Sequence, residues 1–348
     1  MIKLLFFILI VSANTLYADL KPDLHDKDYV DISEDSSEKD SLVYLNPSDF
    51  TYAGNPRVTL TGDMPLKKTS IRPLEFSIFT GSYLSFMVIQ HVIQSNTIWK
   101  EQAEFKIYED GHYALWSDKA GHFFGTYFTS NMMREGFLLS GVSWESSLWW
   151  SALMGLSYST YVEIMDGYGE NWGFSPSDAY MNTLGAIFFI GQHYWPYLQN
   201  FTPKFTYFPA EWHGEHSRKP SDMFIDDYSS HTLWLSVDVN NMLPRSLERY
   251  WPDWMNISVG YAARNLCDTL NPGLYNCDKS RSKHYYDGYW GSPRFIVALD
   301  YDLVQLLPEG GNFWNWIRQS LNYFKLPSPA VEFGPVTKVY LMYPFKVW

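Results

Sequence analysis

The spacing of hydrophobic residues changes from a helical period to a strand period near residue 204. The first part predicts four helices that are rich in aromatic residues and only moderately apolar, at residues 76–99, 118–133, 146–165 and 177–197. Four such helices can bury their apolar sides against one another in a soluble bundle. The same pattern is also compatible with a bundle that is partly sunk in a membrane.

Residues 76–99 contain no Asp, Glu, Lys or Arg. An apolar run of this length is sufficient for one helical crossing of a bilayer. Serine, threonine, glutamine and histidine residues interrupt the run. Hydropathy therefore leaves the soluble and the membrane-embedded alternatives open.

Beyond residue 204, apolar residues alternate with polar or small ones over residues 233–239, 257–263 and 295–303. A period of two is typical of antiparallel strands that are buried on one face. Residues 330–333 and 339–343 add one or two strands. This total of five or six is below the roughly eight strands that a transmembrane barrel needs. Helices followed by strands predict an α+β fold.

A further helix is predicted between two of the strands, at residues 312–324. Its apolar residues recur at helical spacing: Phe313, Trp316, Ile317, Leu321 and Phe324. Such a stripe usually packs on the core of its own protein. The tryptophan content also suits a helix that lies in the headgroup region of a membrane, although Arg318 and Lys325 offer little positive charge.

The N-terminus resembles a secretory signal peptide over residues 1–18, with one lysine, a short apolar run and Ala18 at a plausible cleavage point. An acidic leader, residues 19–45, is predicted to be disordered because it has few large apolar residues. An extended connection (46–74), the helical bundle (75–204) and the β-rich part (205–348) follow. The protein is therefore expected to be exported.

The chain has 348 residues and a net charge of −12, of which the leader supplies −6. This acidity argues against nucleic acid as a partner, because neutralising phosphates requires clustered lysine and arginine. The mean hydropathy of −0.24 excludes a densely packed multi-pass membrane protein, though not a few weakly apolar spans. Protein partners cannot be derived from these numbers.

The two cysteines, Cys267 and Cys277, flank a segment that contains the turn signal Asn-Pro-Gly. In an exported protein such a pair most simply forms a disulfide. Neighbouring metal ligands at the usual spacing are missing from the sequence, so a two-cysteine metal site is not expected.

Three short polar strings interrupt the apolar helices, at residues 116–123, 162–167 and 175–185. Each string carries two polar side chains three or four positions apart, which places both on one face of a helix. The pairs are Asp118 with His122, Glu163 with Asp166, and Asp178 with Asn182. If the three strings converge in the core of the bundle, they form a site.

In sequence order the strings are Asp-Lys-x-x-His-Phe, Glu-x-x-Asp-Gly and Ser-x-x-Asp-x-x-x-Asn-x-x-Gly. This combination resembles an uncharacterised bacterial family of predicted periplasmic lipoproteins that includes YfiM-like proteins, and VanZ-like membrane proteins show a looser version of it. The resemblance covers roughly residues 75–345 and adds Lys119 and Gly185 to the motif. It implies a bacterial envelope location, in the periplasm or the outer membrane, and leaves the chemistry open. No cysteine follows the apolar run near the N-terminus, so a lipid anchor there is not expected.

Three interpretations of the polar residues remain open. Asp118 and Asp178 lie where helices would begin and could be caps, and Asp166 could initiate a turn. His122 and Glu163 are explained least well by capping, and with Asn182 they could form a buried network that holds three helices in register.

The second interpretation is an acid–base site, in which His122 transfers a proton, Glu163 orients its imidazole, and Asp166 or Asp178 engages a second proton. The third is a divalent metal site with His122, Glu163 and Asp166 as ligands, a set that suits Zn, Mn or Fe. No other cofactor is predicted.

The sequence therefore favours an exported, membrane-associated envelope protein with a structural or binding role, for which envelope lipid is the expected partner. The alternative is an envelope hydrolase that acts on a lipid or phosphoester at His122, Glu163 and Asp166. Whether the protein is an enzyme is not decided by the sequence.

Overall fold

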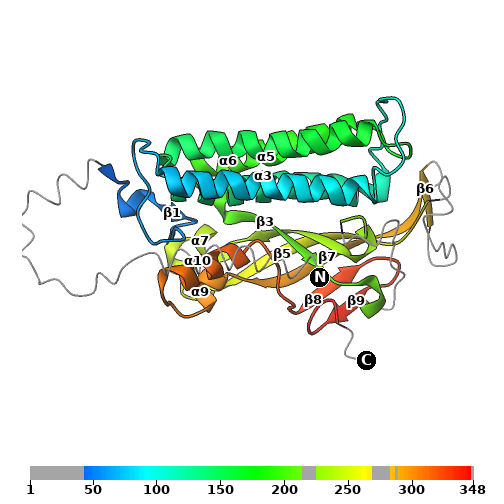
Figure 1. Cartoon of the computed structure of the whole chain (residues 1–348). Helices are drawn as coiled ribbons and strands as arrows, with labels where there is room; N and C mark the ends of the chain where they lie inside the picture. The colour runs from blue at the N-terminus through cyan, green and yellow to red at the C-terminus, as the bar shows by residue number, and fades with distance from the viewer. Residues whose placement is uncertain (1–42, 214–224, 269–282, 287–288, 346–348) are drawn as a thin grey trace, which may run out of the picture. The chain divides into compact units, whose positions relative to one another are not determined.

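The computed structural model describes residues 43–213, 225–268, 283–286 and 289–345 (Figure 1). The predicted signal peptide, most of the acidic leader and Cys277 lie outside these residues, so the signal peptide and the disulfide stay predictions. The main elements are α3 (Pro73–Ser95), α4 (Ser117–Leu139), α5 (Trp144–Gly167), α6 (Pro176–Tyr194), β3 (Phe201–Tyr207), β4 (His231–Val237), β5 (Met255–Asp268), β6 (Lys283–Tyr286), β7 (Tyr289–Tyr301), α10 (Asn312–Leu321), β8 (Ala330–Phe333) and β9 (Lys338–Tyr340). Helices precede a β-rich part, which confirms the α+β prediction.

The four long helices lie where the sequence predicts them, because local signals define their ends. Pro73 and Pro176 occupy the first turns of α3 and α6, where a missing N–H has no cost. Ser143 and Ser175 cap α5 and α6 by accepting hydrogen bonds from the backbone of the first turn.

Helix α4 lies at the centre of the bundle and contacts α3, α5 and α6. Two glycines permit its close approach to the neighbouring helices. A Cβ atom on Gly155 of α5 would lie 2.4 Å from Ser130 Oγ, and one on Gly185 of α6 would lie 2.3 Å from the carbonyl oxygen of Phe123. At Gly185 the neighbour is a backbone atom that cannot rotate away, so a larger residue there would push α4 away.

The strands form an antiparallel sheet in the order β3-β4-β5-β7-β8-β9, with β6 paired to β7. Strand β3 was not singled out by the sequence pattern, because it contains Pro203 and Lys204 and does not alternate clearly. The predicted strands at 233–239, 257–263 and 295–303 correspond to β4, β5 and β7. Figure 1 shows β5 and β7 running in the same general direction as α3, α5 and α6.

The buried face of the sheet carries small and polar residues together with an apolar cluster that includes Trp234, Ile296 and Tyr340. Leu235, Val259 and Val297 are register partners on neighbouring strands, and all three are exposed. Their sequence neighbours, such as Ser236 and Ser258, are buried. The bundle covers the apolar face only in part, for example where the rings of Phe124 and Phe205 stack 5.6 Å apart. The strand pattern was therefore predicted correctly, and the structure shows that the burial is inverted.

The predicted amphipathic helix is confirmed as α10. Trp316 points inward and donates a hydrogen bond to Glu135 of α4 at 3.2 Å, and Arg318 is buried. Phe313, Trp314 and Leu321 are exposed on the same helix. The helix thus packs on the protein and also presents apolar side chains outward.

Of the helices that the structure describes, α3 is the one whose length and apolar composition would suffice to cross a membrane. None of its 18-residue apolar window is buried by the rest of the protein.

Candidate functional site

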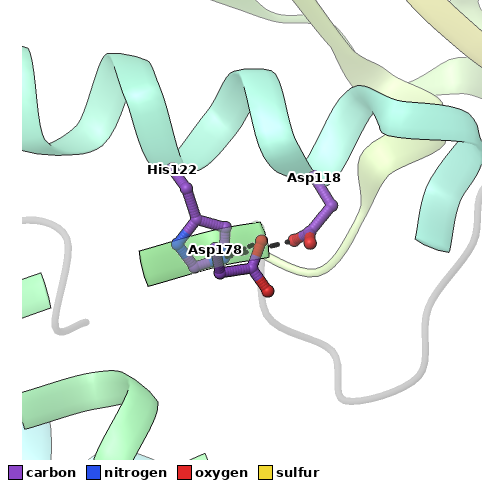
Figure 2. A group of neighbouring side chains, drawn as sticks. All are labelled: Asp118, His122 and Asp178. Atoms are coloured by element: carbon purple, nitrogen blue, oxygen red, sulfur yellow. Dashed lines mark ion pairs between the residues drawn. The ribbon is translucent and has the colours of Figure 1, made fainter. Parts of the chain in front are cut away.

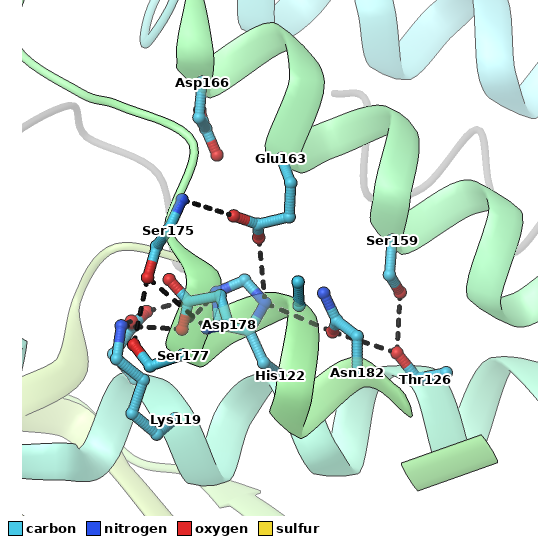
Figure 3. Close-up of polar contacts among 12 residues, drawn as sticks. Lys119, His122, Thr126, Ser159, Glu163, Asp166, Ser175, Ser177, Asp178 and Asn182 are labelled. Atoms are coloured by element: carbon cyan, nitrogen blue, oxygen red, sulfur yellow. Dashed lines mark hydrogen bonds and ion pairs between the residues drawn. The ribbon is translucent and has the colours of Figure 1, made fainter. Parts of the chain in front are cut away.

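The three polar strings converge at one end of the bundle, where α4 and α6 begin and α5 ends (Figure 3). Asp118, Lys119, Glu163, Asp178 and Asn182 are all buried. Since charged side chains are rarely buried without partners, the contacts within this cluster determine what it can do.

The chain enters the cluster through a left-handed turn. Ala114, Leu115 and Trp116 have φ values of 48°, 53° and 67° directly before α4. Each such residue costs about 1–2 kcal/mol for an L-amino acid. Burial of Leu115 and a hydrogen bond from Tyr261 Oη to the carbonyl oxygen of Leu115 at 2.5 Å hold the turn in place. No sequence signal indicated this conformation, because no glycine or asparagine is present in the turn.

The ammonium group of Lys119 lies among three carboxylates. Its Nζ atom is 2.5 Å from Asp110 Oδ1, 2.7 Å from Asp118 Oδ2 and 2.6 Å from Asp178 Oδ1. The three acidic residues come from the loop before the left-handed turn, from α4 and from α6. Lys119 is 7 % exposed, so water screens these ion pairs little.

His122 lies on the other side of the same carboxylates (Figure 2). Its Nε2 atom is 3.5 Å from Asp118 Oδ1 and 3.6 Å from Asp178 Oδ1. Its Nδ1 atom is 3.3 Å from Glu163 Oε1 and 3.3 Å from Asn182 Oδ1. The imidazole therefore connects α4 to α5 and α6, and at 21 % exposure it is the most accessible group of the cluster.

Two buried polar atoms on the Nδ1 side of the imidazole, Glu163 Oε1 and Asn182 Nδ2, have no hydrogen-bond partner within the described part of the chain. On the Nε2 side, Asp178 Oδ1 makes ion pairs but no hydrogen bond. The other oxygen of Glu163 accepts a bond from the backbone N–H of Ser175 at 3.4 Å. The amide oxygen of Asn182 accepts from Thr126 at 3.0 Å. Unpaired buried atoms of this kind are rare and call for a water or another ligand.

The structure places Asp166 apart from this cluster. Its carboxylate accepts a hydrogen bond from Trp99 Nε1 at 2.6 Å, which links the end of α5 to the segment after α3. Asp118 and Asp178 are not the helix caps, since Ser175 caps α6 and Trp116 stands at the cap position of α4. Sequence reasoning missed Asp110, which accepts a hydrogen bond from Ser175 of the third string, and Tyr228, whose hydroxyl donates to Asp118. No spacing pattern connects Asp110 or Tyr228 to the strings.

One group in the described residues has the ligand spacing of a metal site. Ligand atoms of Asp118, His122 and Asp178 lie within 4.8 Å of one another. This set differs from the predicted set of His122, Glu163 and Asp166. Lys119 already supplies a positive charge to the two aspartates of the set, so a metal ion would have to compete with an ammonium group at 2.6–2.7 Å.

Residues 107–190 are similar to a family described as "Predicted periplasmic lipoprotein (DUF2279)". The match runs from the loop before the left-handed turn to the last part of α6, and it contains all three polar strings. It agrees with the exported, periplasmic or envelope location expected from the sequence. No curated protein and no solved structure matches the chain.

Proposed function

We propose that the protein is a membrane-associated, non-catalytic envelope protein in which the polar cluster acts as an internal clamp. A single observation carries this proposal: the Lys119 ammonium bridges carboxylates from three separate segments at 2.5–2.7 Å. The Lys119 ammonium donates hydrogen bonds to Asp110 Oδ1 and Asp118 Oδ2 and makes an ion pair with Asp178 Oδ1. Its positive charge is thereby paired within the protein without any ligand.

The clamp has a structural task in this fold. The left-handed turn before α4 is strained, and the charges at Asp110 and Asp118 flank it in the sequence. Because the carboxylates of Asp110 and Asp118 both pair with Lys119, these ion pairs offset the strain of the turn. They also hold the start of α4 against α6. Buried ionic networks of this kind specify one arrangement of helices, even where their net stabilisation is small.

The second candidate is an envelope hydrolase, and one observation favours it. The His122 imidazole lies between Asp118 and Glu163, is partly exposed, and faces two unpaired buried atoms. In that role His122 would transfer a proton and Glu163 would orient its ring, on a lipid or phosphoester substrate. Asp166 would need to move away from Trp99 in order to take part.

The variant His122→Asn separates the two candidates. Under the structural proposal it lowers the free energy of unfolding by about 1–3 kcal/mol, because buried hydrogen-bonding groups lose their partner. The wild-type protein, purified in detergent, should carry no stoichiometric metal by elemental analysis and should not hydrolyse phospholipid or phosphoester substrates.

His112→Asn provides the matched control, because His112 is exposed and lies outside the cluster. Its ring contacts that of Trp116, with the ring centroids 5.3 Å apart, so the change should cost some stability but less than His122→Asn. Turnover or bound metal in the wild type that disappears in a well-folded His122→Asn protein would favour the hydrolase instead.

A further inference from the structure

The outer surface of the helical bundle is apolar over its whole length. Leu84 and Val88 of α3, Leu153 of α5, and Leu184 and Ile187 of α6 are all exposed. In water a contiguous apolar surface of this kind is unusual for a monomeric protein and indicates a partner.

Charged residues are confined to the two ends of these helices. Glu75 and Glu145 lie in the first turns of α3 and α5, and Lys100 and Glu170 follow their last turns. Between these positions, the charged side chains that the structure describes on α3, α5 and α6 are Glu163 and Asp178, which are buried in the polar cluster, and Asp166, which accepts a hydrogen bond from Trp99.

The sheet repeats this arrangement. Phe295 and Phe333 are register partners on β7 and β8, and both are exposed on the same face as Leu235, Val259 and Val297. The opposite, buried face carries ion pairs: Lys204 Nζ with Asp300 Oδ2 at 3.0 Å, and Arg294 Nε with Glu332 Oε1 at 3.3 Å. The same buried face also carries the apolar cluster of Trp234, Ile296 and Tyr340, so apolar residues lie on both faces of the sheet. Large apolar side chains on the outer face are unusual for a sheet in water and are typical of strands that contact lipid.

The dimensions of the apolar surface fit a bilayer. Helix α3 has 23 residues and is about 34 Å long at 1.5 Å per residue. Strand β7 has 13 residues, and among its residues 291–301 the exposed apolar side chains are Phe295 and Val297. Helix α3 exceeds the hydrocarbon thickness of about 30 Å, and Figure 1 shows α3 and β7 running in the same general direction.

Aromatic residues mark the ends of the same surface. Trp149 near the start of α5 donates a hydrogen bond to Tyr194 at the end of α6 at 3.2 Å, so both rings lie at one level. Tyr168 and Tyr180 are exposed at the opposite ends of α5 and α6. Tryptophan and tyrosine at both borders of an apolar band are characteristic of proteins at the membrane–water interface.

We propose that the outer face of α3, α5 and α6 and the exposed apolar face of the sheet form one belt that contacts the acyl chains of a bilayer. The polar cluster and the ion pairs of the sheet then lie inside the protein, away from lipid. This proposal rests on the membrane association in the proposed function and names its surface. It also explains how a chain of low mean hydropathy lies in a membrane, because its polar residues face inward.

Single arginine substitutions test the belt in the full chain expressed in a bacterial host. Leu184→Arg and Val259→Arg introduce a charge in mid-belt on a helix and on a strand, at side chains that are 49 % and 50 % exposed. A water-soluble protein tolerates such changes, whereas arginine at mid-membrane is strongly disfavoured. We expect at least a tenfold loss of protein from the carbonate-washed membrane fraction.

The matched controls are Ile107→Arg, in the loop between α3 and α4, and Val336→Arg, between β8 and β9; both should stay in the membrane fraction like the wild type. Release of the wild type by carbonate, full retention of both belt variants, or a soluble oligomer that buries the belt would overturn the proposal. If only Leu184→Arg reduces the amount of protein in the membrane fraction, the proposal that the sheet contacts lipid is overturned. All four positions lie outside the ionic cluster, so these results are independent of whether the cluster acts as a clamp.

Discussion

Replacing Lys119 by methionine is expected to destabilise the protein by about 3–5 kcal/mol, the usual cost of removing one partner from a buried ion pair. Methionine retains much of the side-chain volume, so the loss reflects the charge and not a cavity. Asp110, Asp118 and Asp178 would then face one another without the ammonium that lies 2.5–2.7 Å from each of them. Denaturant unfolding of the detergent-purified full chain measures the change.

Two further proteins make this result specific. Lys106→Met removes an exposed lysine whose ammonium donates a hydrogen bond to the backbone carbonyl oxygen of Glu170, and it should change stability by less than about 0.5 kcal/mol. In the double variant Lys119→Met with Asp178→Asn, the loss should be smaller than the sum of the two single losses, since one repelling carboxylate is gone. Additive losses, or a Lys119→Met protein as stable as the wild type, would contradict the clamp.

Replacing Gly185 by alanine is expected to separate α6 from α4. The new Cβ atom would lie 2.3 Å from the carbonyl oxygen of Phe123 and 3.2 Å from the backbone nitrogen of Tyr127. Both are backbone atoms, which cannot rotate away as a side chain can. Overpacking of this kind costs about 1–3 kcal/mol. Because Asn182 lies one turn before Gly185 on α6, its contact with His122 should weaken as well.

The matched control for this change is Gly125→Ala on α4, where no atom lies within 4 Å of the new Cβ. Alanine there should stabilise the helix by up to about 1 kcal/mol, because alanine has the higher helix propensity. Denaturant unfolding of both variants therefore gives shifts of opposite sign. A stabilising effect of Gly185→Ala would show that the two helices are not in close contact at this point.

Much of the fold follows from local features of the sequence. The helical and strand periods, Pro73, Pro176 and the capping serines act over a few residues, so most elements could be predicted without knowing their neighbours; β3, which lacks a clear period, could not. The match of residues 107–190 to an envelope family is likewise a property of the sequence. For the site, the spacing of Asp118 and His122 on one helix face was sufficient to predict that both point the same way.

Other parts of the site depend on contacts between distant segments. Asp110 lies near Lys119 only because the left-handed turn of Ala114, Leu115 and Trp116 reverses the chain. Such a turn has no signature in L-residues, since their propensity opposes it. Asp166 lies three residues after Glu163, a spacing that places both on one face of a helix. Its carboxylate nevertheless accepts a hydrogen bond from Trp99, outside the cluster. Neither outcome is encoded in the spacing of the motif residues.

The sequence by itself determined the four long helices, α10, most strands of the sheet, their order and the polar strings, because these are set by interactions between residues that are near in the chain. Only the tertiary structure decided which carboxylates surround Lys119 and which face of the sheet is buried. The period of two is the same whether the apolar side faces inward or outward. Which face of the sheet is buried is set by long-range packing. Here the packing buries the ion pairs of Lys204 with Asp300 and of Arg294 with Glu332, and leaves part of the apolar face exposed.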